Sequence, residues 1–300
     1  MSILRVNSSG RRALAPALFI ASGTTQYTGA AFAVVLFSVM APTTVAWWRV
    51  TIAALVLLAW RRPWREHLTL REVGASALFG VVMSGMNIAF YEAVARLDLG
   101  VAVSLEFLGP VVVAVIFGRG WLSKLAGLVA FAGVVLISGF GIDRTSSAGV
   151  SGFLWAMLAG GLWAGYILIG RRIARARSGL TSLSIATATG SLVYFPVVAG
   201  DFLSAFESAQ IFWTVVGVAF LSTVVPYSIE QVIMSWIDAP TFALLNALLP
   251  ATSLVVGAVV LRQFPAWPAV VGLLFVSVAV WMASRPPSPG QKKAPGIKET

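Results

Sequence analysis

The chain has 300 residues, of which 58% are apolar and 11% are charged. The charged residues are confined to short clusters between long apolar runs, whereas a soluble fold needs them along every element to cover its surface. This pattern excludes a water-soluble globule and predicts a polytopic membrane protein. The net charge of +10 is divided among several short loops, so we expect no nucleic-acid binding.

The chain contains no cysteine and a single histidine, His67. Disulfides and thiolate metal sites are therefore excluded, and a lone histidine in a basic loop is most simply a solvated side chain. We predict no metal site and no cofactor.

Residues 1–12 are predicted to form a cytoplasmic tail. The apolar run that follows continues to about Ser38, which is longer than the apolar region of a signal peptide, and no convincing small-residue cleavage site follows it. We therefore expect an uncleaved first span.

A bilayer core of about 30 Å needs about 20 helical residues to cross it, and ten apolar runs are candidates. Backbone in lipid must satisfy its own hydrogen bonds, so we expect an all-α bundle. The predicted spans are Ala13–Ser38, Thr43–Trp60, Glu72–Tyr91, Leu99–Phe117, Trp121–Gly139, Ser151–Ile169, Leu180–Ala199, Ile211–Glu230, Ala239–Val260 and Ala266–Ala283.

The basic residues predict the orientation of this bundle. With the N-terminus inside the cell, 17 of the 21 Lys and Arg residues fall on the cytoplasmic side, and the outer loop at 200–210 carries Asp201 and Glu207. The positive-inside rule then places both termini in the cytoplasm. Residues 285–300, rich in Pro, Gly and Lys, are predicted to be a disordered cytoplasmic tail.

The two halves of the chain resemble each other at an offset of 140 residues. DLGVAVSLEFLGP (Asp98–Pro110) aligns with DAPTFALLNALLP (Asp238–Pro250), with Asp and Pro shared at identical spacing. This predicts two five-helix repeats, residues 13–139 and 151–284, joined by an outer linker at 140–150. An odd number of spans inverts the second repeat, an arrangement that suits alternating access.

Glu106 is the acidic residue set well inside a predicted span, and Arg49 is the basic residue within a span. A carboxylate in lipid is costly, so Glu106 should face the bundle interior or a water-filled cavity. Two interpretations stay open. Glu106 and Arg49 form an ion pair with each other, or Glu106 holds a substrate ammonium or a coupling proton while Arg49 lies near the substrate carboxylate. The repeat pairs Glu106 with Asn246.

Pro110 and Pro250 each remove a backbone donor inside an apolar helix. We expect a kink or hinge at each proline. A bolder expectation is that the carbonyls freed one turn upstream, near Glu106 and Asn246, line a substrate cavity.

Other polar and aromatic residues lie at mid-depth in the predicted spans and are candidates to line the same cavity. Packing or contact with lipid explains Trp163 as well as a place in the cavity does, and Gly161 and Gly165 form a small-xxx-small pair that favours close helix packing. The candidates are Gln26, Tyr27, Asn87, Tyr91, Trp163, Tyr166 and Tyr227.

Catalytic signatures are missing from the sequence. It contains no GxxxxGK[ST] nucleotide-binding loop, and a single loop histidine cannot anchor a nucleophile–base pair. We therefore predict that the protein is not an enzyme.

Three segments carry a family resemblance: LGVAVSLEFLGP (Leu99–Pro110), LWAGYILIGRR (Leu162–Arg172) and LSTVVPYSIE (Leu221–Glu230). With Arg49 in the second span, the chain resembles the drug/metabolite transporter superfamily, EamA type, and within it the threonine/homoserine exporters and an aromatic amino-acid exporter. The resemblance implies ten helices in inverted repeats around a central cavity, in a bacterial inner membrane.

The sequence therefore predicts a secondary transporter that exports amino acids, with broad selectivity, by rocking of its two halves. Its expected partners are small amino acids and the lipid bilayer. The alternatives are a nucleotide-sugar or sugar-phosphate exchanger and, from other classes, an intramembrane enzyme or a structural membrane protein. Proton antiport, uniport and oligomeric state are left open.

Overall fold

The computed structural model of the chain describes the backbone of residues 8–117, 121–140, 142–143, 145–173, 179–234, 245–246 and 248–283. Every regular element in these ranges is helical, and they contain no strand. The expectation of an all-α protein is therefore confirmed for the described residues. The predicted tail at 285–300 lies outside them.

Where the structure describes them, the helices follow the predicted spans with some changes at their ends, and residues 239–244 of the predicted span Ala239–Val260 lie outside the described residues. α1 begins at Ser8 and α7 at Ser147, so both extend earlier than the predicted spans into polar sequence. The helices are α1 (Ser8–Leu36), α2 (Pro42–Arg61), α3 (Leu70–Val94), α4 (Leu99–Glu106), α5 (Leu108–Phe117), α6 (Trp121–Phe140), α7 (Ser147–Ile173), α8 (Gly179–Val198), α9 (Ala209–Ala219), α10 (Val225–Met234), α12 (Leu249–Val260) and α13 (Trp267–Ala283), with short turns η1 (Pro63–Arg65), η2 (Phe202–Phe206) and η3 (Phe220–Val224).

Within the described residues, six helical segments are long and apolar enough to cross a membrane: Pro42–Arg65, Leu70–Val94, Leu99–Phe117, Ser147–Ile169, Leu180–Val198 and Ala209–Tyr227. Three shorter apolar helices are Lys124–Ile137, Leu249–Val260 and Trp267–Met282. The sequence predicts ten spans in two repeats, which is more than these six, so the count of ten stays a prediction.

Local sequence signals set several helix ends. α2 begins with Pro42, whose missing N–H would be unpaired at that position anyway, and Arg62 ends it in the left-handed conformation with φ 50°. α3 begins with a capping box, in which Thr69 accepts from the backbone of Glu72 and Glu72 accepts from the backbone of Thr69.

The fourth predicted span is interrupted at Phe107, between α4 and α5. Pro110 is the third residue of α5 and has no N–H to donate to the carbonyl of Glu106, which explains a break at this point. A similar turn at Leu248 precedes α12, in which Pro250 is the second residue. Both prolines therefore sit just after a turn, as expected of hinge positions.

The carbonyl that Pro110 frees lies against α7. A Cβ built at Gly160 of α7 would lie 2.9 Å from the carbonyl oxygen of Glu106, so α7 covers that oxygen. The expectation that this carbonyl lines a substrate cavity stays a prediction. The close crossing uses Gly160 and Gly109, whereas a Cβ at Gly161 would meet open space and one at Gly165 only ordinary contact, so the predicted glycine pair was wrong.

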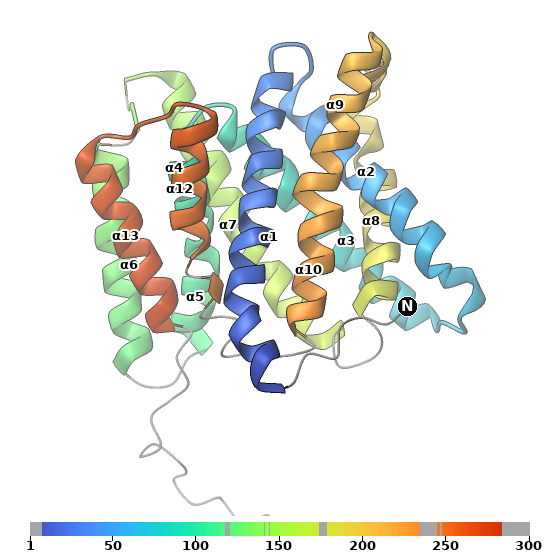
Figure 1. The fold of residues 1–300 in the computed structure, drawn as a ribbon, viewed down its shortest axis with the longest axis horizontal. Helices are drawn as coiled ribbons and strands as arrows, with labels where there is room; N and C mark the ends of the chain where they lie inside the picture. The colour runs from blue at the N-terminus through green and yellow to red at the C-terminus, as the bar shows by residue number, and fades with distance from the viewer. Residues whose placement is uncertain are drawn as a thin grey trace, which may run out of the picture.

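Helices from the first and second halves of the chain pack against each other throughout the bundle. α2 packs on α8, α3 on α7, and α1 on both α10 and α12. α6 and α13 form an extensive pair that lies at one edge of the molecule, on the left of Figure 1. α1 begins and α13 ends at the same end of the bundle, which is the lower end in Figure 1.

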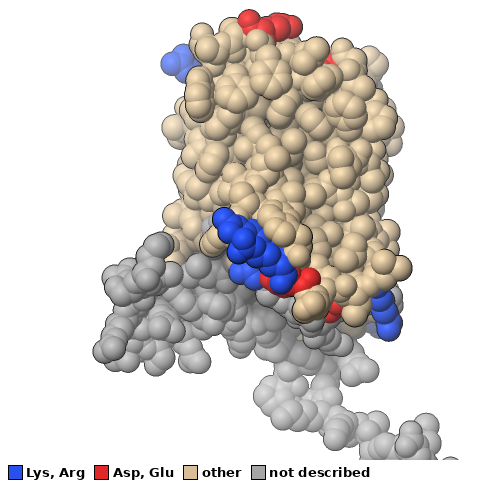
Figure 2. All heavy atoms as spheres, turned by 90° about the vertical axis from the view of Figure 1, so that its right-hand side faces the viewer, with Lys and Arg blue, Asp and Glu red and all other residues tan. Residues whose placement is uncertain are grey.

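The surface matches this arrangement. Figure 2 shows a wide uncharged belt on the face that it presents, with Lys, Arg, Asp and Glu side chains gathered at the two ends. Large apolar side chains such as Leu55, Leu192 and Trp213 are exposed in the described helices. Such a belt is suited to the hydrocarbon layer of a membrane.

Candidate functional site

Arg49 of α2 is a buried cation, with 4% of its surface exposed. Its Nη1 donates a hydrogen bond of 3.1 Å to the hydroxyl of Tyr91 on α3, and its guanidinium carbon lies 4.7 Å from the centre of the Tyr91 ring. A planar, weakly hydrated guanidinium is suited to such a site on an aromatic face. Its Nε has no hydrogen-bond partner among the described residues, so donor capacity remains.

Glu106, the last residue of α4, is 8% exposed. It lies within electrostatic range of Arg49, but no described side chain lies within hydrogen-bond or ion-pair distance of its carboxylate. The direct ion pair between Glu106 and Arg49 is therefore not formed. The two opposite charges are near each other, and each keeps capacity for another partner.

Tyr227 of α10 links these groups, because it interacts electrostatically with Arg49, Tyr91, Glu106 and Glu230. Two further tyrosines surround the same charges. Tyr27 of α1 interacts with Glu106 and Glu230, and Tyr166 of α7 interacts with Tyr227 and Glu230. We call these seven residues the central polar cluster: Tyr27, Arg49, Tyr91, Glu106, Tyr166, Tyr227 and Glu230.

Glu230 is the member of this cluster that sequence reasoning missed. We placed it at the end of a predicted span, but α10 continues past it to Met234. The hydroxyl oxygen of Ser22 on α1 lies 3.3 Å from both Glu230 Oε1 and the carbonyl oxygen of Pro226, so its one proton is donated to one or the other. The spacing of Tyr227 and Glu230, three residues apart on one helix face, was the signal that could have revealed it.

A π-helical turn, η3, precedes these residues. Pro226 has no N–H, and the N–H of Val225 bonds to the carbonyl of Phe220 five residues back. Such turns shift the facing of the following residues and are frequent at functional sites. Here the turn precedes the helix that carries Tyr227 and Glu230.

Aromatic contacts pack against the cluster from α7. Trp163 makes an edge contact with Phe107, with ring centres 4.4 Å apart, and therefore covers the break next to Glu106. Tyr166 stacks on Phe79 of α3 at 4.6 Å. Trp163 thus packs at the helix break, and its place in a substrate cavity stays a prediction.

The remaining candidates are less closely tied to the cluster. Asn87 is buried one turn before Tyr91 and donates from Nδ2 to the carbonyl of Met83 in its own helix. Gln26 is half-buried beside Tyr27. Asn246 lies in a short helical stretch before α12 with its side chain partly exposed, so its proposed equivalence to Glu106 stays a prediction.

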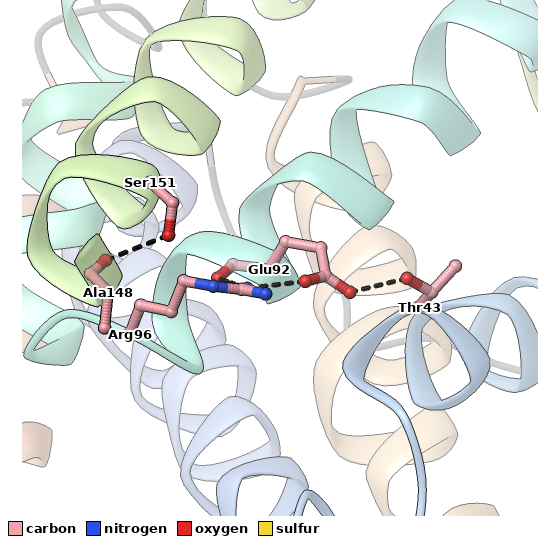
Figure 3. A network of polar contacts seen from close by, with 5 residues as sticks. All are labelled: Thr43, Glu92, Arg96, Ala148 and Ser151. Atoms are coloured by element: carbon pink, nitrogen blue, oxygen red, sulfur yellow. Dashed lines mark hydrogen bonds and ion pairs between the residues drawn. The ribbon is translucent and has the colours of Figure 1, made fainter.

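A second polar network lies at one end of the bundle (Figure 3). Glu92, near the end of α3, accepts from the hydroxyl of Thr43 over 2.5 Å and forms an ion pair with Arg96 at 2.5 Å. Arg96 also donates to the carbonyl of Glu92, where a cation complements the end of the helix dipole. These contacts hold α2 and α3 together within the first half of the chain.

Two contacts at this end join the first half to the second. The backbone N–H of Leu99, which begins α4, donates 3.0 Å to Oε1 of Gln263 in the loop between α12 and α13. The N–H of Ala41 donates 3.1 Å to Asp201. Asp98 itself makes no side-chain cap on α4, and burial raises its pKa.

At the other end, Thr181 of α8 joins the halves. Its hydroxyl accepts from Arg61 and donates to Glu66, each over 3.0 Å, and Arg61 and Glu66 are 3.6 Å apart. The bundle is therefore tied across its halves at both ends, with the central polar cluster between them.

An apolar pocket of about 320 Å³ lies away from the cluster, between α5, α6 and α7. Its lining includes Leu108, Val112, Phe131 and Met157 and offers almost no polar atoms. Part of that lining is exposed at the uncharged surface, as with Phe131. It does not coincide with the predicted substrate cavity.

The chemistry available at the cluster is recognition of charge. The described residues contain no group of three His, Cys, Asp or Glu side chains that could hold a metal ion. One buried guanidinium and a nearby carboxylate that pairs with no described side chain match the two charges of a zwitterion.

Comparison with known proteins identifies the family. Residues 150–285 match the EamA-like transporter family. The threonine/homoserine exporter RhtA of Escherichia coli K12 is 33% identical over 239 residues, covering 78% of this chain and 79% of the relative. RhtA of Salmonella typhimurium LT2 is 30% identical over 246 residues, covering 82% of each chain.

The fold also has a counterpart among solved structures. One crystal structure, of a protein whose name specifies no activity, matches with a TM-score of 0.56 and 17% identity, covering 89% of this chain and 96% of that one. This likeness concerns the fold alone. The sequence relatives, which span most of the chain, show that it belongs to the EamA-like transporters of the drug/metabolite transporter superfamily.

Proposed function

We propose that this protein exports small zwitterionic amino acids of the threonine and homoserine type by alternating access. The observation that carries the proposal is the pairing of Arg49 with Glu106, which lie in electrostatic range without a direct ion pair. In this proposal Arg49 binds the substrate carboxylate and Glu106 binds its ammonium group. The relatives named as threonine/homoserine exporters support the substrate class.

The packing supports two inverted repeats. Shifted by 140 residues, α2 corresponds to α8 and α6 to α13, and each of these helices packs on its own counterpart. The pairs α3–α7 and α10–α1 likewise correspond to each other. Such reciprocal contacts are those expected of a pseudo-two-fold axis.

The crossing of α6 and α13 has the same reciprocity. A Cβ at Gly133 would lie 2.8 Å from the carbonyl oxygen of Gly272, and one at Gly272 would lie 2.6 Å from that of Gly133. The two glycines are 139 residues apart, one short of the repeat offset. Their mutual contact supports an axis passing close to this crossing.

Alternating access requires contacts between the halves that open in turn. The Leu99–Gln263 bond at one end and the Thr181 contacts at the other supply such ties. Rocking of one repeat against the other breaks one set while the other is kept, and the central polar cluster is then exposed to one side at a time.

We propose that the protein lies in the inner membrane of a bacterial cell with both termini in the cytoplasm. α1 begins and α13 ends at the same end of the bundle (Figure 1), and the exposed basic residues Arg62, Arg65 and Arg71 flank the start of α3. The acidic residues Asp201 and Glu207 lie in the loop before α9. This charge distribution agrees with the positive-inside rule.

Broad selectivity follows from the same geometry. In this proposal Arg49 and Glu106 recognise features that all zwitterionic amino acids share, whereas the surrounding aromatic residues discriminate weakly among side chains. A phosphate-bearing substrate is less well matched, because Arg49 is the one buried Lys or Arg among the described residues.

The test is counterflow in proteoliposomes that hold purified protein and unlabelled L-threonine. Uptake of labelled L-threonine and L-homoserine above that of protein-free vesicles is expected, with competition from other neutral amino acids. Transport of nucleotide sugars or sugar phosphates, without transport of any amino acid, would refute the proposal.

A further inference from the structure

We propose that Glu230, held by Ser22, is a proton-binding residue of the transport cycle, releasing a proton when substrate binds and regaining it after substrate leaves. This inference rests on the proposed exporter function and adds the coupling ion, a proton, and the residue that carries it.

The hydrogen bonds around Ser22 suit a carboxyl group that changes its protonation state. Ser22 is 1% exposed, and its hydroxyl oxygen lies 3.3 Å from both Glu230 Oε1 and the carbonyl oxygen of Pro226. A hydroxyl has one proton to donate and lone pairs that accept. When Glu230 is ionised, Ser22 donates to its carboxylate.

When Glu230 is protonated, the same geometry is satisfied in the other direction. The acid O–H of Glu230 donates to the Ser22 oxygen, and the Ser22 hydroxyl turns to donate to the carbonyl of Pro226. That carbonyl lies on the same helix, four residues before Glu230. Both protonation states therefore find hydrogen-bond partners without movement of the backbone, which keeps either state from being left with an unpaired buried group.

Three tyrosines lie between Glu230 and the two charges that we assign to substrate binding. Tyr27 from α1, Tyr166 from α7 and Tyr227 from its own helix lie within electrostatic range of it. Tyr27 and Tyr227 are also within range of Glu106, and Tyr227 within range of Arg49. With both carboxylates ionised the cluster has one positive and two negative charges.

A substrate ammonium group is attracted by that excess negative charge, and a proton on Glu230 removes it. Charges interact more strongly in an interior of low dielectric than in water, so protonation of Glu230 weakens binding of the ammonium group and binding of the substrate expels the proton. Mutual exclusion of the two cations is the requirement for antiport.

Glu230 loses its proton when substrate binds. The O–H bond of Glu230 breaks, its electron pair stays on the carboxylate, and the proton passes to a water molecule in the open side of the path. The partial exposure of Glu230 and of Tyr227 in this structure is consistent with such access.

The test uses full-length protein in proteoliposomes and compares wild type with Glu230→Gln, Ser22→Ala and Glu207→Gln. Glu207 is an exposed loop residue and serves as the matched control, because the same chemical change there lies far from the cluster in the sequence and outside its contacts. Two measurements are made, counterflow of labelled L-threonine at equal pH, and accumulation of L-threonine driven by an imposed pH gradient.

Wild type and Glu207→Gln are expected to show both activities. Glu230→Gln is expected to keep counterflow, which confirms that it is folded, and to lose accumulation driven by the gradient. The half-saturating threonine concentration should rise at acidic pH in wild type and be independent of pH in Glu230→Gln. Ser22→Ala should retain counterflow and shift this pH dependence.

The outcomes distinguish failure of the coupling role of Glu230 from failure of the proposed exporter function. If wild type shows no amino-acid counterflow, the exporter proposal fails, and the coupling proposal fails with it. If wild type shows counterflow but no response to a pH gradient, or if Glu230→Gln accumulates threonine like wild type, only the coupling role is refuted. Loss of counterflow in Glu230→Gln would assign the residue to substrate binding and equally refute that role.

Discussion

The guanidinium of Arg49 lies on the ring of Tyr91 and bonds to its hydroxyl, while Glu106 remains nearby without touching it. The one buried cation of the described core is thus held in place by an aromatic side chain. A direct ion pair would have to be broken to admit a substrate, and leaving a buried charge unpaired is costly. Support by Tyr91 positions the guanidinium and leaves it able to bind an anion.

Tyr91→Phe should weaken substrate binding and preserve the fold. The change keeps the ring beneath Arg49 but removes a hydrogen bond to a charged group, which contributes about 1.5 kcal/mol, or about tenfold in affinity. The measurement is the half-saturating threonine concentration in counterflow. Tyr194→Phe, which removes a hydroxyl outside the cluster, is the control, and an equal effect of both changes would contradict the positioning role of Tyr91.

Arg49→Lys should abolish most counterflow even though the charge is kept. A lysine ammonium lacks the planar fork that both lies on the ring and presents further donors, so the substrate carboxylate loses its partner. Arg65→Lys, in the exposed loop after α2, makes the same substitution away from the cluster. Wild-type activity in Arg49→Lys would show that only charge is needed there.

Glu106→Gln should raise the half-saturating concentration for zwitterionic substrates by at least about tenfold, because a charged partner of the ammonium group is replaced by a neutral one. Removal of the substrate's ammonium group should weaken binding less in this variant than in wild type. Inhibition of counterflow by N-acetyl-threonine, compared with threonine, measures this. An unchanged preference for threonine would remove Glu106 from ammonium recognition.

The sequence was sufficient to predict the helices and the charged centre. Periodic polar breaks, the lone Glu106 and the lone Arg49 within apolar runs, and Pro110 at a helix break are all local signals. They depend on the cost of placing charge or an unpaired backbone group in an apolar environment, and that cost does not depend on which helices are neighbours.

The features that were missed depend on neighbours. The sequence alone places Glu230 at the end of a span, because polar residues follow Tyr227. Ser22 comes close to Glu230 only through the packing of α1 on α10. The sequence likewise does not predict that Gly160, and not Gly161, lies at the close helix crossing, since adjacent glycines differ only in which way they face on α7. Facing is set by the bundle, so a single sequence does not fix it.

Gly160→Ala should destabilise the protein while Gly161→Ala does not. A Cβ at residue 160 would lie 2.9 Å from the carbonyl oxygen of Glu106, so α7 must move away, at a cost of about 1 to 3 kcal/mol typical of overpacking. A Cβ at residue 161 meets open space and replaces a glycine in a helix, which is neutral or slightly favourable. The melting temperatures of the purified variants measure the difference, and equal values would show that the crossing is looser than described.

Gln263→Ala should favour opening at the end of the bundle where α4 begins. Gln263 accepts from the N–H of Leu99 and so ties the loop after α12 to the first half of the chain, and its removal leaves that N–H to water.

The chain has no cysteine, so a single Asn87→Cys substitution provides a probe of opening. Asn87 is 4% exposed, and the rate at which a membrane-impermeant maleimide labels the cysteine reports opening. Thr181→Val, which breaks the tie at the opposite end, is the matched control. Labelling at position 87 from the outer side should be faster when Gln263→Ala is added to the Asn87→Cys protein. It should be slower when Thr181→Val is added. A change in the same direction for both would mean that these contacts stabilise the fold as a whole and do not select between two alternately open states.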